Sequence, residues 1–268
     1  MEAILIEYPS AVMLAGFYAL PRMLAMFSML PMFNRQALPG LLRIGVASAF
    51  AVFLVPMLLD TSFNELRHGG MMIGILAKEA MVGFLIGFFV AIPIWAVDVM
   101  GVFVDNQRGA SIAATINPLT GHDTSPLGEL FSQAALVLLL ISGGILMLLD
   151  LVYASYLIWP VFKLLPSFSD QTPMLLLGQL DRLMTLAVLL SAPVIFAMFL
   201  AEIGLAIVSR FVPQLQVFFM AMPIKSAIAM YVFAVYMATL LGYISNEIAG
   251  FPNTVSGVLN SIFSGPVK

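Results

Sequence analysis

The chain has 268 residues, of which 62% are hydrophobic and 9% charged, and its formal net charge is −3. Ordinary soluble domains are about 45–50% apolar, so this composition, with a mean hydropathy of +1.06, excludes a soluble globule and predicts a membrane-associated protein. The lack of a basic tract argues against nucleic-acid binding, and the lack of cysteine excludes disulfides and thiolate metal sites.

The first quarter of the chain predicts two apolar helices. The stretch 11–33 is apolar except for Arg22, which follows Pro21, so we expect a helix that is kinked at this point. A link at 34–40 leads to a second apolar run at 44–59, which is short for a full membrane crossing. The polar stretch 60–70 ends this region.

The middle of the chain contains two longer apolar regions. Residues 71–104 predict either one long helix or a helix broken near Pro93. A polar loop of 22 residues is predicted from Asp105 to Pro126. The apolar stretch 130–165 is too long for one perpendicular span, so we expect a bend at Gly143-Gly144 or at Trp159-Pro160.

The last third predicts two more helices. Residues 166–182 form a second polar link, and an apolar helix follows at 183–208. A turn at 211–214 precedes a last helix at 226–244, and 246–268 is a mixed tail with little helical pattern. Basic residues are spread evenly over the links, so charge does not predict the orientation in a membrane.

The chain carries none of the common catalytic motifs. It has no His-x-x-x-His pair, no Gly-x-x-x-x-Gly-Lys phosphate loop and no Gly-x-Ser-x-Gly nucleophile turn. We therefore expect neither an enzyme nor a cofactor or metal site.

Several charged residues lie in or beside apolar segments. An unpaired charge at the centre of a bilayer costs at least about 2.5–3.5 kcal/mol, so these side chains are expected to be paired or hydrated. One alternative function follows, an ion-coupled transporter in which Asp98, Glu202 and Arg210 bind substrate or protons near the midplane. The intramembrane charges, besides Arg22, are Lys78, Glu79, Asp98, Glu202, Arg210 and Lys225.

Two glycine pairs are candidates for helix packing. Gly83 and Gly87 form a small-xxx-small pattern that lets another helix approach closely, and Glu79 precedes them on the same face. Gly143 and Gly144 favour either close packing or, more strongly, a bend.

The polar loop is the principal candidate site. Long loops inside compact membrane proteins are uncommon unless they are functional, and this one is punctuated by glycine and proline. It is interpreted as a gate or plug, with a simple solvated link as the alternative. Its candidate residues are Asp105, Asn106, Gln107, Arg108, Gly109, Asn117, Pro118, Gly121 and Pro126.

Several short blocks from about residue 10 to residue 245 carry a resemblance to a known family. They are Lys78-Glu79 with Gly83 and Gly87, Pro93-Ile-Trp95, Asp105-Asn-Gln-Arg-Gly-Ala110, Asn117-Pro118, Thr124-Ser-Pro126, Ser142-Gly-Gly144, Phe199-Leu-Ala-Glu-Ile-Gly204, Ser209-Arg-Phe-Val-Pro213 and Met222-Pro-Ile-Lys-Ser-Ala-Ile228. With these blocks the chain resembles the SctT family (YscT, SpaR and FliR-like) of type III secretion export-apparatus proteins.

The resemblance implies a non-enzymatic, all-α subunit of a helical export gate in the bacterial inner membrane, within the basal body. It implies SctR and SctS subunits, the switch protein SctU, unfolded substrates and membrane lipid as partners. It also implies one domain, with SctR-like helices and the plug-like loop 105–126 in residues 1–165, a link at 166–182, an SctS-like helix pair at 183–245 and a tail at 246–268.

Overall fold

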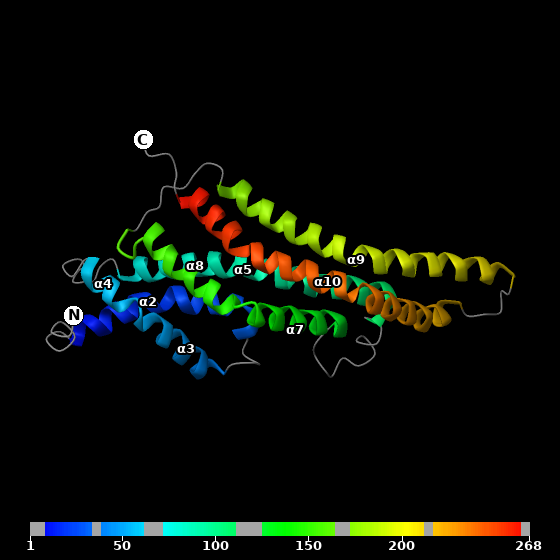
Figure 1. Ribbon diagram of the computed structural model, residues 1–268, viewed down its shortest axis with the longest axis horizontal. Helices are drawn as coiled ribbons and strands as arrows, with labels where there is room; N and C mark the ends of the chain where they lie inside the picture. The colour runs from blue at the N-terminus through cyan, green and yellow to red at the C-terminus, as the bar shows by residue number, and fades with distance from the viewer. Residues whose placement is uncertain are drawn as a thin grey trace. The chain divides into compact units, whose positions relative to one another are not determined.

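The computed structural model describes residues 9–33, 39–61, 72–110, 125–163, 172–211 and 217–263. Within these ranges the chain is helical and has no strand, which confirms the all-α prediction (Figure 1). The elements are α2 (Pro9–Met29), the short 3-10 helix η1 (Pro31–Phe33), α3 (Gly40–Val52), α4 (Val55–Thr61), α5 (Met72–Arg108), α7 (Pro126–Ile141), α8 (Gly144–Ile158), α9 (Thr172–Phe211) and α10 (Val217–Phe263).

The described helices include four that are long and apolar enough to cross a membrane. These segments are Val12–Met29, Met72–Arg108, Thr172–Phe211 and Phe219–Gly250, and the broken pair α7 and α8 is a fifth candidate. At about 1.5 Å per residue, α5, α9 and α10 exceed the roughly 30 Å of a bilayer core. Length and composition therefore indicate a membrane protein.

Helix breaks differ from the predictions in one place and agree with them in two. The run 44–59 is not one helix, because α3 ends at Val52 and α4 begins at Val55. In contrast, α5 continues through Pro93, so the long-helix alternative holds. The stretch 130–165 is interrupted at Gly143, whose φ of 76° is a conformation that glycine adopts without steric cost.

The predicted polar link and tail are both too long. α9 already begins at Thr172, so the second half of the expected link is helical. α10 extends to Phe263, which makes most of the expected tail helical as well. The missed signal is helical spacing, since Ile244, Ile248 and Val255 recur at intervals of four and seven residues and are each 2% exposed.

The chain forms two compact units, each built from separate stretches of sequence. Unit 1 comprises Met1–Ala91, Gly143–Leu177 and Gly250–Lys268, and unit 2 comprises Ile92–Ser142 and Gly178–Ala249. Unit 1 therefore holds α2, α3, α4, α8 and the first half of α5. Unit 2 holds the second half of α5, α7 and most of α9 and α10.

In unit 1, α2 and α5 meet at glycines. A Cβ on Gly83 would overlap the carbonyl oxygen of Arg22, and a Cβ on Gly87 would lie 2.7 Å from that of Met26. Backbones can approach this closely only where a side chain is missing. Beside this contact, the rings of Phe27 and Phe33 stack with centroids 4.1 Å apart.

In unit 2, α9 and α10 lie side by side as an antiparallel pair, drawn from yellow to orange in Figure 1. An ion pair joins Arg182 Nη2 to Glu247 Oε2 at 2.6 Å. A second ion pair joins Glu202 Oε2 to Lys225 Nζ at 2.7 Å, about twenty residues away along each helix. Pairs at both ends hold the two helices in one register.

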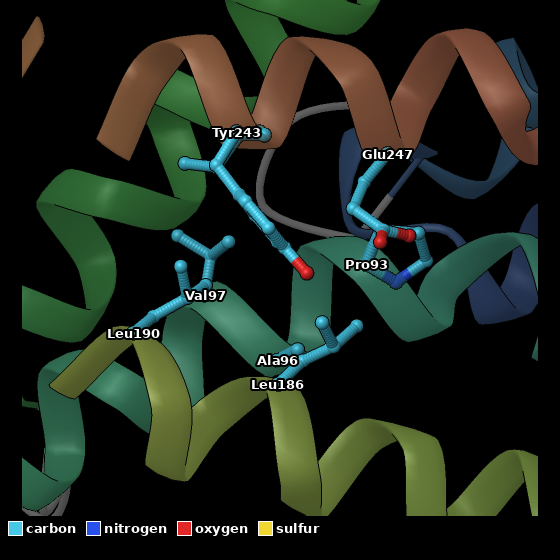
Figure 2. A pocket seen from close by; sticks show the side chains of 8 residues that line it. Pro93, Ala96, Val97, Leu186, Leu190, Tyr243 and Glu247 are labelled. Carbon is cyan, nitrogen blue, oxygen red and sulfur yellow. The ribbon is translucent and has the colours of Figure 1, made fainter. Parts of the chain in front are cut away.

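The middle of unit 2 is closely packed. Figure 2 shows Tyr243 of α10 pointing toward α5 and α9, with Val97 and Leu190 beside it. The space left between these side chains is about 10 Å³, no more than one water molecule requires. This pocket is a packing defect and has no room for a ligand.

Candidate functional site

One buried carboxylate joins the two ends of the polar loop. Asp105 is 3% exposed, and its Oδ1 accepts a hydrogen bond from Arg108 Nε at 2.7 Å. Its Oδ2 accepts from Ser125 Oγ at 2.5 Å and from the backbone N–H of Leu127 at 3.0 Å. We call these four residues the stem, because they close the base from which residues 109–124 depart.

Local sequence explains where the helices at the stem stop and start. Gly109 follows α5 with a φ of 84°, the left-handed conformation in which helices commonly end. Ser125 caps α7 by accepting from Gly128 N at 2.9 Å, and Pro126 occupies the first turn, where its missing N–H is not needed. This Ser-Pro start was a readable signal in the sequence.

The structure corrects the boundaries of the predicted loop. Asp105, Asn106, Gln107 and Arg108 form the last turn of α5 rather than loop, and Pro126 is the first residue of α7. The polar side chains of this turn make contacts at the end of the helix. Asn117, Pro118 and Gly121 lie outside the described residues.

A tight helix crossing supports the stem. A Cβ on Gly101 of α5 would overlap the backbone nitrogen of Gly128 in α7. A Cβ on Gly128 would lie 2.7 Å from Oδ1 of Asp98. These two glycines were not predicted as a contact, because they lie 27 residues apart and form no local motif.

Replacing Asp105 by Ala will loosen the stem. Three donors lose a charged acceptor, and each hydrogen bond to a charged group is worth about 1.5–3 kcal/mol. We expect limited proteolysis within residues 109–124 to become faster in the assembled protein, with Asp105→Asn intermediate because its amide oxygen still accepts. The matched control is Asp150→Asn, an exposed carboxylate on α8. Equal cleavage rates in Asp105→Ala and Asp150→Asn would contradict the stem.

A polar hollow of about 430 Å³ lies beside the stem in unit 2. The end of α5 contributes Gln107 and Arg108, α9 contributes Glu202, and α10 contributes Met222 and Lys225. Lys225 is 9% exposed and donates to the carbonyl oxygen of Gln107 at 3.4 Å, in addition to its pair with Glu202. Charged side chains from three helices therefore meet at the base of the loop.

The charges near the N-terminal half of α5 form a buried cluster in unit 1. We call Arg22, Lys78 and Glu79 the charge cluster. Glu79 accepts two hydrogen bonds from Arg22, at 2.7 and 2.9 Å, and its Oε1 lies 2.6 Å from Lys78 Nζ. Arg22 and Glu79 are 0% exposed and Lys78 is 6% exposed.

The charge cluster also holds the C-terminal end of α8. Arg22 donates to the carbonyl oxygen of Trp159 at 3.0 Å, and Lys78 donates to those of Pro160 and Val161 at 3.0 and 2.6 Å. These carbonyl oxygens lie in the three residues after α8, near the partial negative charge at the end of the helix, which two cations offset. These partners of α8 were missed, because nothing in the local sequence predicts them.

Further contacts complete the surroundings of Arg22. Its Nη1 donates to Ser155 Oγ at 2.9 Å, and its guanidinium lies 3.9 Å from the ring centre of Tyr156. Tyr156 in turn donates its hydroxyl to the carbonyl oxygen of Ala19 at 3.0 Å. The cluster thus fastens α2, α5 and α8 together.

The three residues of the transporter hypothesis have different surroundings. Glu202 pairs with Lys225, whereas Asp98 is half-buried against Gly128. Arg210 is exposed near the end of α9, and no ion pair joins it to another part of the described chain. No shared site of the three residues is evident among these contacts.

Gly143 marks the break between α7 and α8. A Cβ built at this position would meet no atom of the described residues within 4 Å, so no described helix packs against it. Gly144, the first residue of α8, is buried.

Comparison with known proteins places the chain in a family. Residues 13–251 match the family described as bacterial export proteins, family 1. The Yop proteins translocation protein T of Yersinia pestis is 39% identical over 91% of this chain and 93% of its own length. The surface presentation of antigens protein SpaR of Shigella flexneri is 33% identical, over 82% of this chain and 83% of its own length. The flagellar biosynthetic protein FliR of Bacillus subtilis is 31% identical, over 84% of this chain and 86% of its own length.

These matches confirm the resemblance to SctT and FliR proteins and agree with the apolar helices. The chain belongs to family 1 of the bacterial export proteins and is a membrane protein of an export apparatus.

Proposed function

We propose that this protein is a subunit of the type III secretion export gate in the bacterial inner membrane, within the basal body. Its segment 109–124, held by the stem, helps to close the channel at rest and moves aside for unfolded substrates. The names of the relatives, which include a translocation protein, support the export role. The protein acts by opening and closing a path and carries out no catalysis.

The observation that carries the plug role is the buried stem. A closed gate has to block ions across an energised membrane, so the blocking segment needs a fixed position rather than a loose tether. Asp105 ties the exit of α5 to the entrance of α7 through the stem hydrogen bonds. The stem therefore gives the plug segment a fixed point of attachment at each end.

The apolar surface of α9 and α10 supports a multi-subunit assembly. Monomeric soluble proteins rarely expose large apolar patches, so this surface requires lipid or other subunits. We propose SctR and SctS subunits, the switch protein SctU and membrane lipid as partners, and an SctR-like part (1–165) followed by an SctS-like pair (183–245). The exposed side chains include Met184, Val188, Phe196, Phe199, Phe211, Phe219, Met230, Tyr231 and Val235.

The test is to replace residues 111–124 by a short Gly/Ser linker in the assembled export apparatus. The stem stays intact, because Asp105 and Ser125 are retained. We expect the ion conductance of cells or of reconstituted particles to rise several-fold while the particle still assembles. The control is Asp150→Asn, an exposed carboxylate on α8, which leaves residues 111–124 unchanged.

Unchanged conductance in the linker variant, with normal assembly, would reject the plug role and leave the export role standing. Transport of a small solute by the purified chain alone would favour the ion-coupled transporter instead. Co-purification with other small membrane proteins is the result that the gate predicts.

A further inference from the structure

We propose that Lys225 is a positioning residue that fixes the end of α5 on the α9 and α10 pair and thereby sets where the plug segment begins. Lys225 and Met222 lie three residues apart on one face of α10, and we call them the seat. This inference rests on the proposed gate function and names the contact that holds the gate in its resting position.

The position of the ammonium group is the first argument. The carbonyl oxygen of Gln107 belongs to the last turn of α5, where carbonyls lack partners within the helix. Lys225 Nζ donates to this oxygen at 3.4 Å and is held from the other side by Glu202 Oε2 at 2.7 Å. A cation placed at the negative end of a helix stabilises that end.

The methionine of the seat is the second argument. A Cβ on Gly109 would lie 3.4 Å from both Cγ and Cε of Met222, so the backbone of Gly109 lies directly against this side chain. Gly109 is also the residue at which the chain turns out of α5, with a φ of 84°. Met222 therefore supports the turn at Gly109, and Lys225 binds the carbonyl oxygen of Gln107, two residues before that turn.

The contacts of the seat with α5 are weaker than the contacts within the stem. The stem has three hydrogen bonds of 3.0 Å or less to the buried carboxylate of Asp105. The seat has one hydrogen bond of 3.4 Å to α5 and a flexible thioether. The contact of Lys225 with Gln107 is therefore expected to break more easily than the stem. Lys225 keeps Glu202 as a partner throughout, which limits the cost of unseating.

The experiment measures the seat directly in the assembled particle. The chain has no cysteine, so spin labels can be attached at Asn106→Cys and Ala206→Cys, two exposed positions on α5 and α9. Molecules in which the end of α5 contacts the seat are called seated. We expect Lys225→Met to lower the ratio of seated to unseated molecules by roughly 5- to 30-fold. The distribution of distances between the two spin labels is expected to broaden. Lys225→Arg keeps a cationic donor at this position and is expected to keep the narrow distribution of distances.

The matched control is Arg182→Met, which removes the other ion pair of the same two helices far from the end of α5. A general loss of α9 and α10 pairing would give both variants the same distance distribution, and this result would overturn the proposal. An unchanged distance in Lys225→Met would overturn it as well. A changed distance without increased ion leak supports the seat and counts against the plug, so the two proposals fail separately.

Discussion

Replacing Glu79 by Ala will lower the thermal midpoint of the solubilised assembly by roughly 6–20 °C, the largest effect expected for any single side chain here. Glu79 is the one acid of the charge cluster, and Arg22 and Lys78 both pair with it. Its removal leaves two cations buried without a counter-charge, and breaking a buried pair in this way costs about 3–5 kcal/mol. Glu79→Gln keeps one acceptor oxygen and is expected to lie between the wild type and Glu79→Ala.

Replacing the whole charge cluster by apolar residues separates its two roles, which are the mutual pairing of its charges and the binding of carbonyl oxygens after α8. Buried ion pairs exchanged for apolar residues of similar volume are often neutral, so the triple variant Arg22→Met, Lys78→Met and Glu79→Leu restores stability if mutual pairing is all that the cluster provides. The structure predicts only partial recovery. The buried carbonyl oxygen of Val161 loses the ammonium donor of Lys78 in this variant, and a buried group left unpaired costs about 1–3 kcal/mol.

The control for this series is Glu129→Gln, because the carboxylate of Glu129 is exposed on α7. Surface substitutions usually change stability by less than about 0.5 kcal/mol. A midpoint for Glu79→Ala within the range of the Glu129→Gln control would show that the cluster is not a structural centre. Full recovery of stability in the triple variant would reject the contact with the end of α8 as a source of stability, and would leave the mutual pairing of the three charges standing.

Local composition predicted the apolar helices because hydrophobicity is carried by the residues themselves. α5 illustrates this, since its apolar run was visible and only its continuation through Pro93 was open. α10 shows the limit, because its last turns mix polar residues with Ile248 and Val255, and burial of those two side chains depends on the rest of the fold.

The site was predictable as a region but not as a set of contacts. The sequence drew attention to Asp105, yet its partner Ser125 lies 20 residues away. Arg22 and Glu79 are separated by 57 residues, so their charges were predicted to be paired or hydrated without a partner being named. Such pairs form only when helices cross, and the crossing points depend on packing that no local pattern encodes. Polar residues at the end of α5 were therefore interpreted as loop although they serve the helix end.

Replacing Gly83 by Ala will separate α2 from α5 and disrupt the charge cluster. The added Cβ overlaps the carbonyl oxygen of Arg22, a backbone atom that cannot turn aside, so the helices have to move apart. Overpacking of a well-packed core costs typically about 1–3 kcal/mol. The displacement also shifts Arg22 away from Glu79, which lies one helical turn before Gly83. We therefore expect a loss above the overpacking range, measured as the thermal midpoint and as the yield of assembled particles.

Unit 1 supplies a graded series for this test. At Gly87 the new Cβ would lie 2.7 Å from a backbone oxygen, and at Gly16 it would lie 4.0 Å from a Val55 methyl group. At Gly45 it would meet no atom of the described residues within 4 Å. Helix propensity alone favours Ala over Gly by about 1 kcal/mol, so Gly45→Ala and Gly16→Ala are expected to be neutral or stabilising. Gly87→Ala is expected to destabilise, but less than Gly83→Ala. Helix propensity acts equally at all four positions. If the thermal midpoints of the variants fall as the contact distance of the new Cβ shortens, the close approach of α2 to α5 is the cause. Equal midpoints for Gly83→Ala and Gly45→Ala would mean that the two helices do not touch there.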